Sequence, residues 1–276
     1  MPLSINTNIA SLTAQRSFLN SNSALETAFE RLSTGKRINS ASDDAAGLAI
    51  ATELNSRVSG LNQAVRNVND GISMVQIMEG TYDEVTSILQ RMRDMAVQAA
   101  NGSLSSTEQG YLETEQTALQ SALNDALEQA TFSNIDLADN TSASVISISI
   151  QAGSNTGDAV SIALTSANAS NASGLGITAI DLSSAATAAI GLADAAIGHV
   201  ATQRAQLGAY QAQLESTVRN LSNVAENTAA AAGRIMDTDY AAETANLTKA
   251  QILQQAATSV LAQANAQPQA VLSLLQ

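Results

Sequence analysis

Apolar residues recur along much of this chain at alternating steps of four and three residues. That spacing places side chains on one face of an α-helix and forms a coiled-coil seam. The longest series predicts a helix from about residue 44 to residue 99, which at ~1.5 Å per residue is roughly 80 Å long. Its seam consists of Leu54, Val58, Leu61, Val65, Val68, Ile72 and Val75, then, after one extra step of three, Met78, Tyr82, Val85, Leu89, Met92, Ala96 and Ala99.

Two further helices follow from the same spacing. Residues 101–102, Asn-Gly, end the long helix, and a second helix begins near Ser105. Towards the C-terminus, an unbroken series over residues 186–225 contains only two long polar residues, Arg204 and Gln211. Polar residues on such a seam often fix the register of the two helices at some cost in stability.

The middle of the chain has a different pattern. Residues 145–150 and 160–164 alternate between apolar and small polar side chains, and a Gly-Ser-Asn-Thr-Gly turn at 153–157 joins them. This alternation predicts a β-hairpin with one buried face. Residues 166–182 are rich in Ser, Ala, Asn and Gly, which indicates an irregular loop. The fold class is therefore mainly α: a long antiparallel helical coiled-coil rod with a small β-hairpin at its far end.

Both ends of the chain carry an apolar stripe, although chain ends are usually loose and polar. The stripes consist of Ile5, Ile9, Leu12 and Leu19, followed after a slip by Leu25, Phe29 and Leu32, and of Leu253, Ala257, Val260, Ala264, Val271 and Leu274. Burying a large side chain contributes roughly 1.5–3 kcal/mol, whereas ordering each residue costs roughly 1–2 kcal/mol. A lone terminal helix is thus unstable, and we expect the ends to become ordered when several copies share these seams.

Composition and charge narrow the classes of partner. The 276 residues carry a net charge of −13, with 3% aromatic residues and no tryptophan. No Lys or Arg occurs between Arg93 and Arg204, which argues against nucleic acid and anionic membranes as partners. No apolar run approaches the length of a membrane span. Residues 1–4 lack a basic segment followed by an apolar one, so we expect no general secretory signal.

The sequence offers few groups for catalysis. His199 is the single histidine and there is no cysteine, so a two-histidine or thiolate metal site within one chain is excluded. No Gly-x-Ser-x-Gly or phosphate-binding Gly-Lys motif occurs. Asp43 and Asp44 precede the long helix, where carboxylates cap the N-terminus and complement the helix dipole. We therefore predict no enzyme activity, no catalytic or metal-binding residues and no cofactor.

Several segments together resemble bacterial flagellin. The most specific is residues 31–50, RLSTGKRINSASDDAAGLAI, which resembles the N-terminal signature of that family. Further matching segments are residues 5–8, 67–73, 89–98, 232–240 and 271–276, and the resemblance covers about 1–135 and 185–276. The family often ends in Arg, so Gln276 is a small departure.

The resemblance implies the structural subunit of the flagellar filament, a helical homopolymer used for swimming. It divides the chain into an inner-tube helix (1–40), long helices of the rod (41–135), a hairpin and outer loop (136–182), a returning rod helix (183–236) and a second inner-tube helix (237–276). Ile5, Ile9, Leu12, Leu19, Leu253, Val260, Val271 and Leu274 would form the polymerisation seam. The short middle segment implies a minimal flagellin without large outer domains.

The resemblance also implies partners and a location. The family leaves the cell through the flagellar type III export channel, so the protein is expected to be secreted into the extracellular filament. An export chaperone, a filament cap and the hook–filament junction proteins are the implied protein partners. Gln90, Arg91, Met95 and Glu115 resemble residues through which a vertebrate Toll-like receptor senses flagellin.

Two other functions are compatible with the same residues. A hook–filament junction protein of the same superfamily is the nearer alternative, although the flagellin-like tail and the complete 43–47 segment favour flagellin. A secreted adhesin or immune ligand is the alternative from another class. Whether the purified protein seeds filaments distinguishes these functions.

Overall fold

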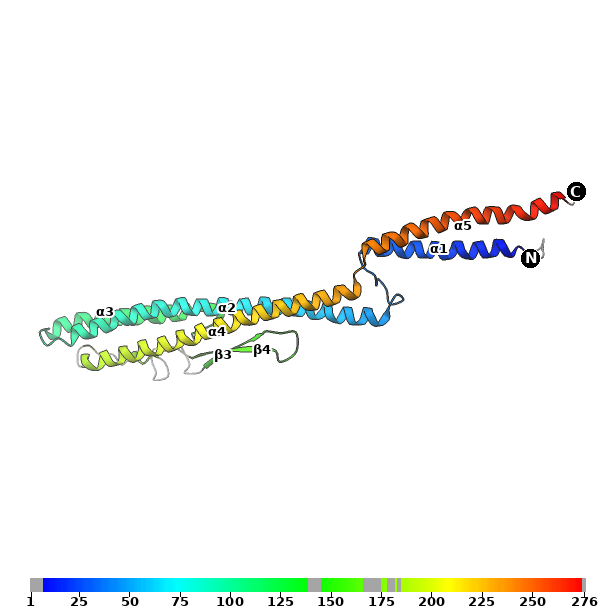
Figure 1. The fold of residues 1–276 in the computed structure, drawn as a ribbon. Coiled ribbons are helices and arrows are strands. Elements are labelled where there is room, and N and C mark those ends of the chain that lie inside the picture. The colour runs from blue at the N-terminus through cyan, green and yellow to red at the C-terminus, as the bar shows by residue number, and fades with distance from the viewer. Residues whose placement is uncertain (1–6, 139–144, 166–174, 178–181, 183–184, 275–276) are drawn as a thin grey trace. The chain divides into compact units, whose positions relative to one another are not determined.

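The computed structural model describes residues 7–138, 145–165, 175–177, 182 and 185–274. Its helices are α1 (Ile9–Thr34), α2 (Ala45–Ala99), α3 (Ser106–Glu128), α4 (Ala186–Met236) and α5 (Tyr240–Leu274), and its strands are β1 (Thr131–Phe132), β2 (Ile135–Asp136), β3 (Val145–Gln151) and β4 (Ala159–Thr165) (Figure 1). The mainly α class is confirmed, and the helix bounds agree closely with the periodic pattern.

The chain forms two compact units. One unit comprises Met1–Val58 with Asn227–Gln276, and we call it the terminal unit. The other comprises Ser59–Glu226, and we call it the central unit. The boundaries fall inside α2 and α4, because an uninterrupted helix can contribute one part of its length to each of two packed bodies.

In the central unit, α2 and α4 run antiparallel along the predicted seams. Met78, Leu89 and Met92 of α2 are fully buried, as is Leu214 of α4. These residues belong to one apolar cluster that continues along both helices. The predicted four-three series on α2 and α4 are thus confirmed as the packed faces.

Ion pairs across α2 and α4 fix their register. Arg93 Nε donates to Asp194 Oδ1 at 2.6 Å, and this hydrogen bond raises the pKa of the Arg93 guanidinium. Arg204, one of the two polar seam residues, has its guanidinium 3.1 Å from the Asp83 carboxylate and 3.9 Å from that of Glu79. These side chains are at least one-third exposed, so each pair contributes little stability and serves chiefly to select the register.

Helix α3 begins at a complete capping box. Ser105 Oγ accepts a hydrogen bond from the Glu108 backbone N–H, and the Glu108 carboxylate accepts one from the Ser105 N–H at 2.7 Å. These hydrogen bonds lower the pKa of the Glu108 carboxyl. The C-terminal half of α3 is anchored in the core by Leu123 and Leu127, which are both fully buried.

A small hairpin, β1–β2, follows α3 and was not foreseen from the sequence. Its two-residue turn consists of Ser133 and Asn134, which have φ values of +47° and +68°. Positive φ at both central positions is the backbone shape that two-residue hairpin turns favour. The signal in the sequence is a single Phe-Ser-Asn-Ile stretch, and flanking strands of two residues give no visible alternation.

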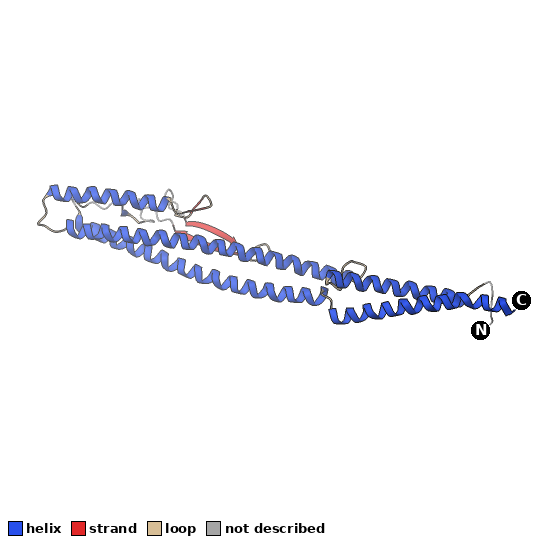
Figure 2. Cartoon of the chain, turned by 90° about the horizontal axis from the view of Figure 1, so that it is seen from above, coloured by secondary structure: helices blue, strands red, loops and turns tan. Residues whose placement is uncertain are grey.

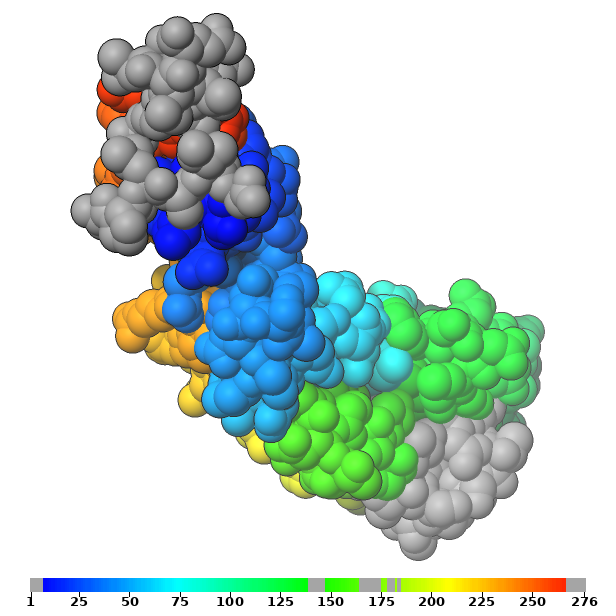
Figure 3. Space-filling view, turned by 90° about the vertical axis from the view of Figure 1, so that its right-hand side faces the viewer, coloured from blue at the N-terminus to red at the C-terminus, as the bar shows by residue number. Residues whose placement is uncertain are grey.

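The predicted hairpin is present as β3–β4, with antiparallel register from Val145 opposite Thr165 to Gln151 opposite Ala159. Ile150 and Ile162 turn inward, whereas the Ser147 and Ser161 hydroxyls lie 2.8 Å apart on the exposed face. Figure 2 shows the strands alongside the long helices, and in Figure 3 the green hairpin lies against the yellow helix α4.

We expected the hairpin at the far end of the long helices. It lies instead beside α2, near Gly60 and Gly71. A Cβ on Gly71 would overlap Ile150 Cδ1, and one on Gly60 would lie 3.0 Å from Ser154 Cβ. The absence of side chains at these two positions lets the hairpin approach α2 closely. The loop expected at 166–182 lies mostly outside the described residues. Of the few residues of this stretch that the structure describes, Leu175, Ile177 and Leu182 are buried.

In the terminal unit, α1 and α5 pack as an antiparallel pair, so neither terminal helix stands alone as the sequence argument assumed. Their common seam is built from small residues, namely Ser11, Ala14 and Ala28 of α1 and Ala250, Ala257 and Ala264 of α5. Asn8, the N-cap of α1, donates to the Ala264 carbonyl at 2.7 Å, and Gln254 donates to Asn22 Oδ1 at 3.1 Å. The two terminal helices are therefore held together within one chain.

We expect Gly71→Ala to destabilise the protein by about 1–3 kcal/mol, because the added methyl group overpacks the contact with Ile150. Gly80→Ala is the matched control on the same helix, since nothing lies within 4 Å of a Cβ at that position. That change should stabilise the protein by up to ~1 kcal/mol through helix propensity. Urea unfolding followed by circular dichroism measures both, and an equal gain from the two variants would contradict the close approach of the hairpin.

Candidate assembly interface in the terminal unit

Two connecting segments of the terminal unit are joined by backbone hydrogen bonds. Lys36, between α1 and α2, forms a β-bridge with Asp237, between α4 and α5. The Arg37 N–H donates to the Met236 carbonyl at 2.6 Å, and the Thr238 N–H donates to the carbonyl of Gly35 at 3.0 Å. The connector that leads out of α1 and the one that leads into α5 are thereby coupled, which positions the two terminal helices as a pair.

The aspartates of the first connector organise its backbone. Asp44 Oδ1 accepts from the Gly47 N–H at 2.9 Å and so caps α2, as predicted. Asp43 instead folds the loop: its Oδ2 accepts from the Ser40 N–H at 2.9 Å and the Asn39 N–H at 3.0 Å. These hydrogen bonds, that from Ser40 foremost, lower the pKa of the Asp43 carboxyl. Both carboxylates have structural roles that account for their position.

A charged pair also joins the end of α1 to the start of α5. Arg31, in the last turn of α1, lies 3.8 Å from the carboxylate of Glu243, in the first turn of α5. Glu243 is only 7% exposed, which is unusual for a carboxylate and places it on the α1–α5 seam. Breaking a buried pair leaves an uncompensated charge, so this contact favours a single register of the two helices.

The large apolar residues of the predicted terminal seams lie on the outside of the α1–α5 pair. Exposed fractions are 65% for Ile9, 56% for Leu12, 66% for Leu19, 48% for Leu253 and 53% for Val260, and Phe29 and Ile252 are exposed as well. Ile5 lies outside the described residues, as do the side chains of Val271 and Leu274. The intramolecular seam thus takes the small residues and leaves a neighbouring apolar face on each helix uncovered.

The residues expected to meet a receptor lie on α2 and α3 of the central unit. Arg91 Nη2 and Nε donate to Glu115 Oε1 at 2.6 and 3.0 Å, and both side chains are about half exposed. Gln90 is exposed beside them. Met95, however, is fully buried in the core of the folded chain and is not exposed beside them. It lies on a row of α2 side chains that points inward, next to the four-three seam that faces α4.

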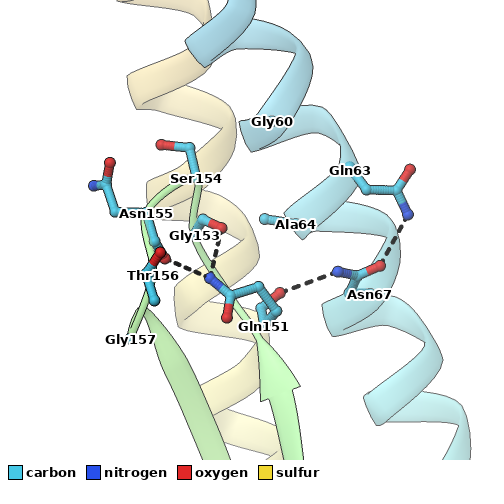
Figure 4. A pocket seen from close by; sticks show the side chains of 10 residues that line it. All are labelled: Gly60, Gln63, Ala64, Asn67, Gln151, Gly153, Ser154, Asn155, Thr156 and Gly157. Carbon is cyan, nitrogen blue, oxygen red and sulfur yellow. Dashed lines mark hydrogen bonds between the residues drawn. The ribbon is translucent and has the colours of Figure 1, made fainter.

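A shallow pocket of about 430 Å³ lies between α2 and the β3–β4 turn. Its lining residues are uncharged, and Figure 4 shows that side-chain amides around it hydrogen-bond to one another and to backbone carbonyls. Gln63 donates to Asn67, Asn67 donates to the Gln151 carbonyl at 3.2 Å, and the Gln151 amide donates to the carbonyls of Gly153 and Asn155. This network fastens the turn to α2 and contains no nucleophile paired with a base.

None of the helices in the described part of the chain combines the length and the apolar character needed to cross a membrane. In the same part of the chain, no three His, Cys, Asp or Glu side chains gather in an arrangement that would hold a metal ion. The paired termini with their uncovered apolar faces are therefore the most distinctive feature, and they define a helical structural subunit.

Comparison with known proteins gives the family. The model of the bacterial flagellin N-terminal helical region matches residues 5–143, and that of the C-terminal helical region matches residues 190–275. The chain belongs to the bacterial flagellin family. Flagellin A of Vibrio cholerae is 36% identical, with all of both chains aligned, and the flagellin of Halalkalibacterium halodurans is 42% identical over 99% of each chain.

The relatives also show how short the middle of this chain is. The alignment with the Vibrio protein runs over 382 residues and so includes segments that this chain lacks, whereas the Halalkalibacterium protein matches over 275 residues. This chain is thus a minimal flagellin. The crystal structure of Bacillus cereus flagellin superposes with a TM-score of 0.47 at 25% identity, covering 60% of this chain and 94% of that one.

The connector should loosen in acid. Because the folded loop lowers the pKa of Asp43, the hydrogen bonds to Asn39 and Ser40 are complete above the unfolded pKa of about 3.9 and are lost as the pH falls through the folded value. Hydrogen-exchange protection of the Ser40 amide should fall in the same pH range. Asp43→Asn should remove this pH dependence, and wild-type protection that does not change with pH would contradict the assignment.

Proposed function

We propose that this flagellin polymerises through the uncovered apolar faces of α1 and α5, which make its terminal unit the contact surface between copies in the flagellar filament. The observation that carries the proposal is that small residues and large apolar residues occupy different faces of these helices. Small residues form the contact within one chain, whereas Leu19, Leu253 and Val260 remain about half exposed or more. Contiguous apolar faces on a subunit mark a surface that another molecule covers.

The spacing of these exposed residues places them on one continuous face of each helix. Leu253 and Val260 are seven residues apart and so lie on one face of α5, while Leu12 and Leu19 have the same spacing on α1. Each large side chain buried between copies contributes roughly 1.5–3 kcal/mol. Ile5, Val271 and Leu274 extend the two series by their spacing. Copies of the same two ends therefore supply both sides of the contact.

The distribution of charge favours contact through the terminal unit. Residues 1–58 and 227–276 contain seven Lys and Arg against eight Asp and Glu, whereas residues 59–226 contain five against seventeen. The central unit thus carries nearly all of the net charge of −13. Like charge opposes close packing of neighbouring central units and leaves the near-neutral terminal unit as the surface at which copies associate most easily.

The function as a structural filament subunit rests on the family, whose relatives are named flagellins along the full length of the chain. The hook–filament junction protein and the secreted adhesin are not favoured by these relatives. By the same resemblance we propose export through the flagellar type III channel, with a chaperone on the C-terminal segment. We further propose a filament cap that adds new subunits and junction proteins that link the filament to the hook.

Leu253→Asp together with Val260→Asp should abolish polymerisation and leave the single chain folded, because two charges enter a face that only other copies bury. The matched control is Gln251→Asp with Gln255→Asp, which adds the same charge at exposed positions of the same helix. Sedimentation and electron microscopy of seeded solutions measure assembly, and circular dichroism checks the fold. Normal filaments from the first variant would refute the proposed face.

A second candidate function is recognition by the flagellin-sensing Toll-like receptor. The exposed pair of Arg91 and Glu115, with Gln90 beside it, supports this proposal because arginine side chains are frequent energetic anchors of protein interfaces. Met95 is not part of this proposed contact, because it is buried in the folded chain.

Arg91→Ala should weaken binding of the monomer to the purified receptor ectodomain by roughly tenfold or more, as loss of an interface anchor does. Met95→Leu should leave binding unchanged, because that side chain is a packing residue. Surface plasmon resonance measures both. Equal affinities of wild type and Arg91→Ala would remove this function from consideration and would leave the filament function untouched.

A further inference from the structure

The buried side of α3 carries a row of polar side chains whose inner atoms have no hydrogen-bond partner. On Gln116 both the amide nitrogen and the amide oxygen are unpartnered, and the same is true of Gln120 Nε2 and Asn124 Oδ1. These residues are four apart and therefore lie along one stripe of the helix. Gln116 is only 3% exposed, so bulk water does not replace the missing partners.

The register of α3 against α2 brings a further polar atom to this row. The contact of Arg91 with Glu115 shows which residues of these two antiparallel helices lie at the same level. Counting along both helices from that pair places Asn124 at the level of Tyr82. The Tyr82 hydroxyl is buried and has no partner either, and burial raises its pKa to about 12.

Helix α4 contributes to the same level of the core. The pair of Arg93 with Asp194 fixes its alignment with α2. In that register His199 falls between the levels of Gln116 and Gln120, and His199 Nε2 is a buried atom without a partner. All three helices of the central unit therefore place unsatisfied polar atoms along one stretch of their packing.

Such a seam weakens the attachment of α3. Buried polar groups in folded proteins are nearly always hydrogen-bonded, and one that is not loses its hydration without compensation. The N-terminal half of α3 has little apolar burial to offset this, because Tyr111 is 72% exposed and Leu112 is only partly buried. The exposed pair of Arg91 with Glu115 adds little. Leu123 and Leu127 anchor only the other half.

Beneath this weakly held half lies an apolar part of α2. Ile88 and Met95 are buried although they lie beside, not on, the four-three seam that meets α4. The α2–α3 register places Met95 opposite Tyr111 and Leu112. One side-chain hydrogen bond, from Gln109 Nε2 to the Ala99 carbonyl at 3.2 Å, closes the end of this region.

We propose that residues 106–120 of α3, which include the unpartnered Gln116 and Gln120, open and reclose as a local unit on the α2–α4 body and transiently expose an apolar strip of α2 that includes Met95. The pivot is the anchored half of α3, around Leu123 and Leu127. Local openings of this kind have free energies below that of global unfolding, and they occur where few apolar contacts hold a segment. The inference concerns the single chain and does not rest on the assembly interface.

The absence of cysteine makes the opening directly measurable, since one introduced cysteine is a unique probe. Met95→Cys reports on the strip, and Met78→Cys is the matched control, because both methionines are fully buried on α2. Under native conditions, a thiol reagent should label the Met95→Cys variant roughly tenfold faster or more than the Met78→Cys variant. A tenfold factor corresponds to the free-energy cost of one unsatisfied buried polar group. Equal rates at the two positions would overturn the proposal.

A second substitution tests the cause. Gln116→Leu in the Met95→Cys background removes two unpartnered atoms at similar volume, so it should slow the labelling by a similar factor. Unchanged or faster labelling would show that the polar seam is not what weakens α3. Hydrogen exchange of the unaltered protein gives an independent measure: amides at 112–116 should exchange faster than those at 89–96 of α2, and equal protection would also refute the opening.

Discussion

The antiparallel seam between α2 and α4 is the constraint on which the central unit depends. With 3% aromatic residues, the chain cannot build a thick globular core, so burial has to come from a long row of Leu, Val, Met and Ala side chains. Such a row specifies two faces but only weakly specifies their offset, because shifting it by one heptad restores similar contacts. Arg204 and Arg93 supply what the apolar row lacks, since each meets carboxylates at only one offset.

The terminal unit is also built on an antiparallel pair of helices, but its large apolar residues face outward. Small residues at the contact between α1 and α5 let the helices approach closely while burying little apolar area. The hydrogen bonds of Asn8 and Gln254 and the charged pair of Arg31 with Glu243 make the pairing specific. Large apolar side chains are thereby kept for the outer faces. A subunit that used them internally would be more stable alone and would have less to offer to another copy.

Close approach elsewhere is governed by missing side chains. Gly71 costs helix propensity in the middle of α2, roughly 1 kcal/mol against alanine. Ile150 Cδ1 occupies the space that a Cβ at this position would need. The β3–β4 hairpin is then fastened by amide hydrogen bonds around Gln151 and by the Tyr210 hydroxyl, which accepts from the Ala163 N–H at 3.3 Å. Position and attachment of the hairpin are thus decided by different residues.

The sequence by itself determined the long helices, the strands of β3–β4, the capping role of Asp44 and the family, because periodicity, capping residues and motifs are local properties. Only the tertiary structure decided that small residues such as Ala257 form the intramolecular seam and leave Leu253 exposed, that Met95 is buried, and that the hairpin lies beside Gly71. The reason is physical. A repeating pattern shows which side chains share a face, but a partner is chosen by close approach, and alanine, serine and glycine permit it without any signal in hydrophobicity.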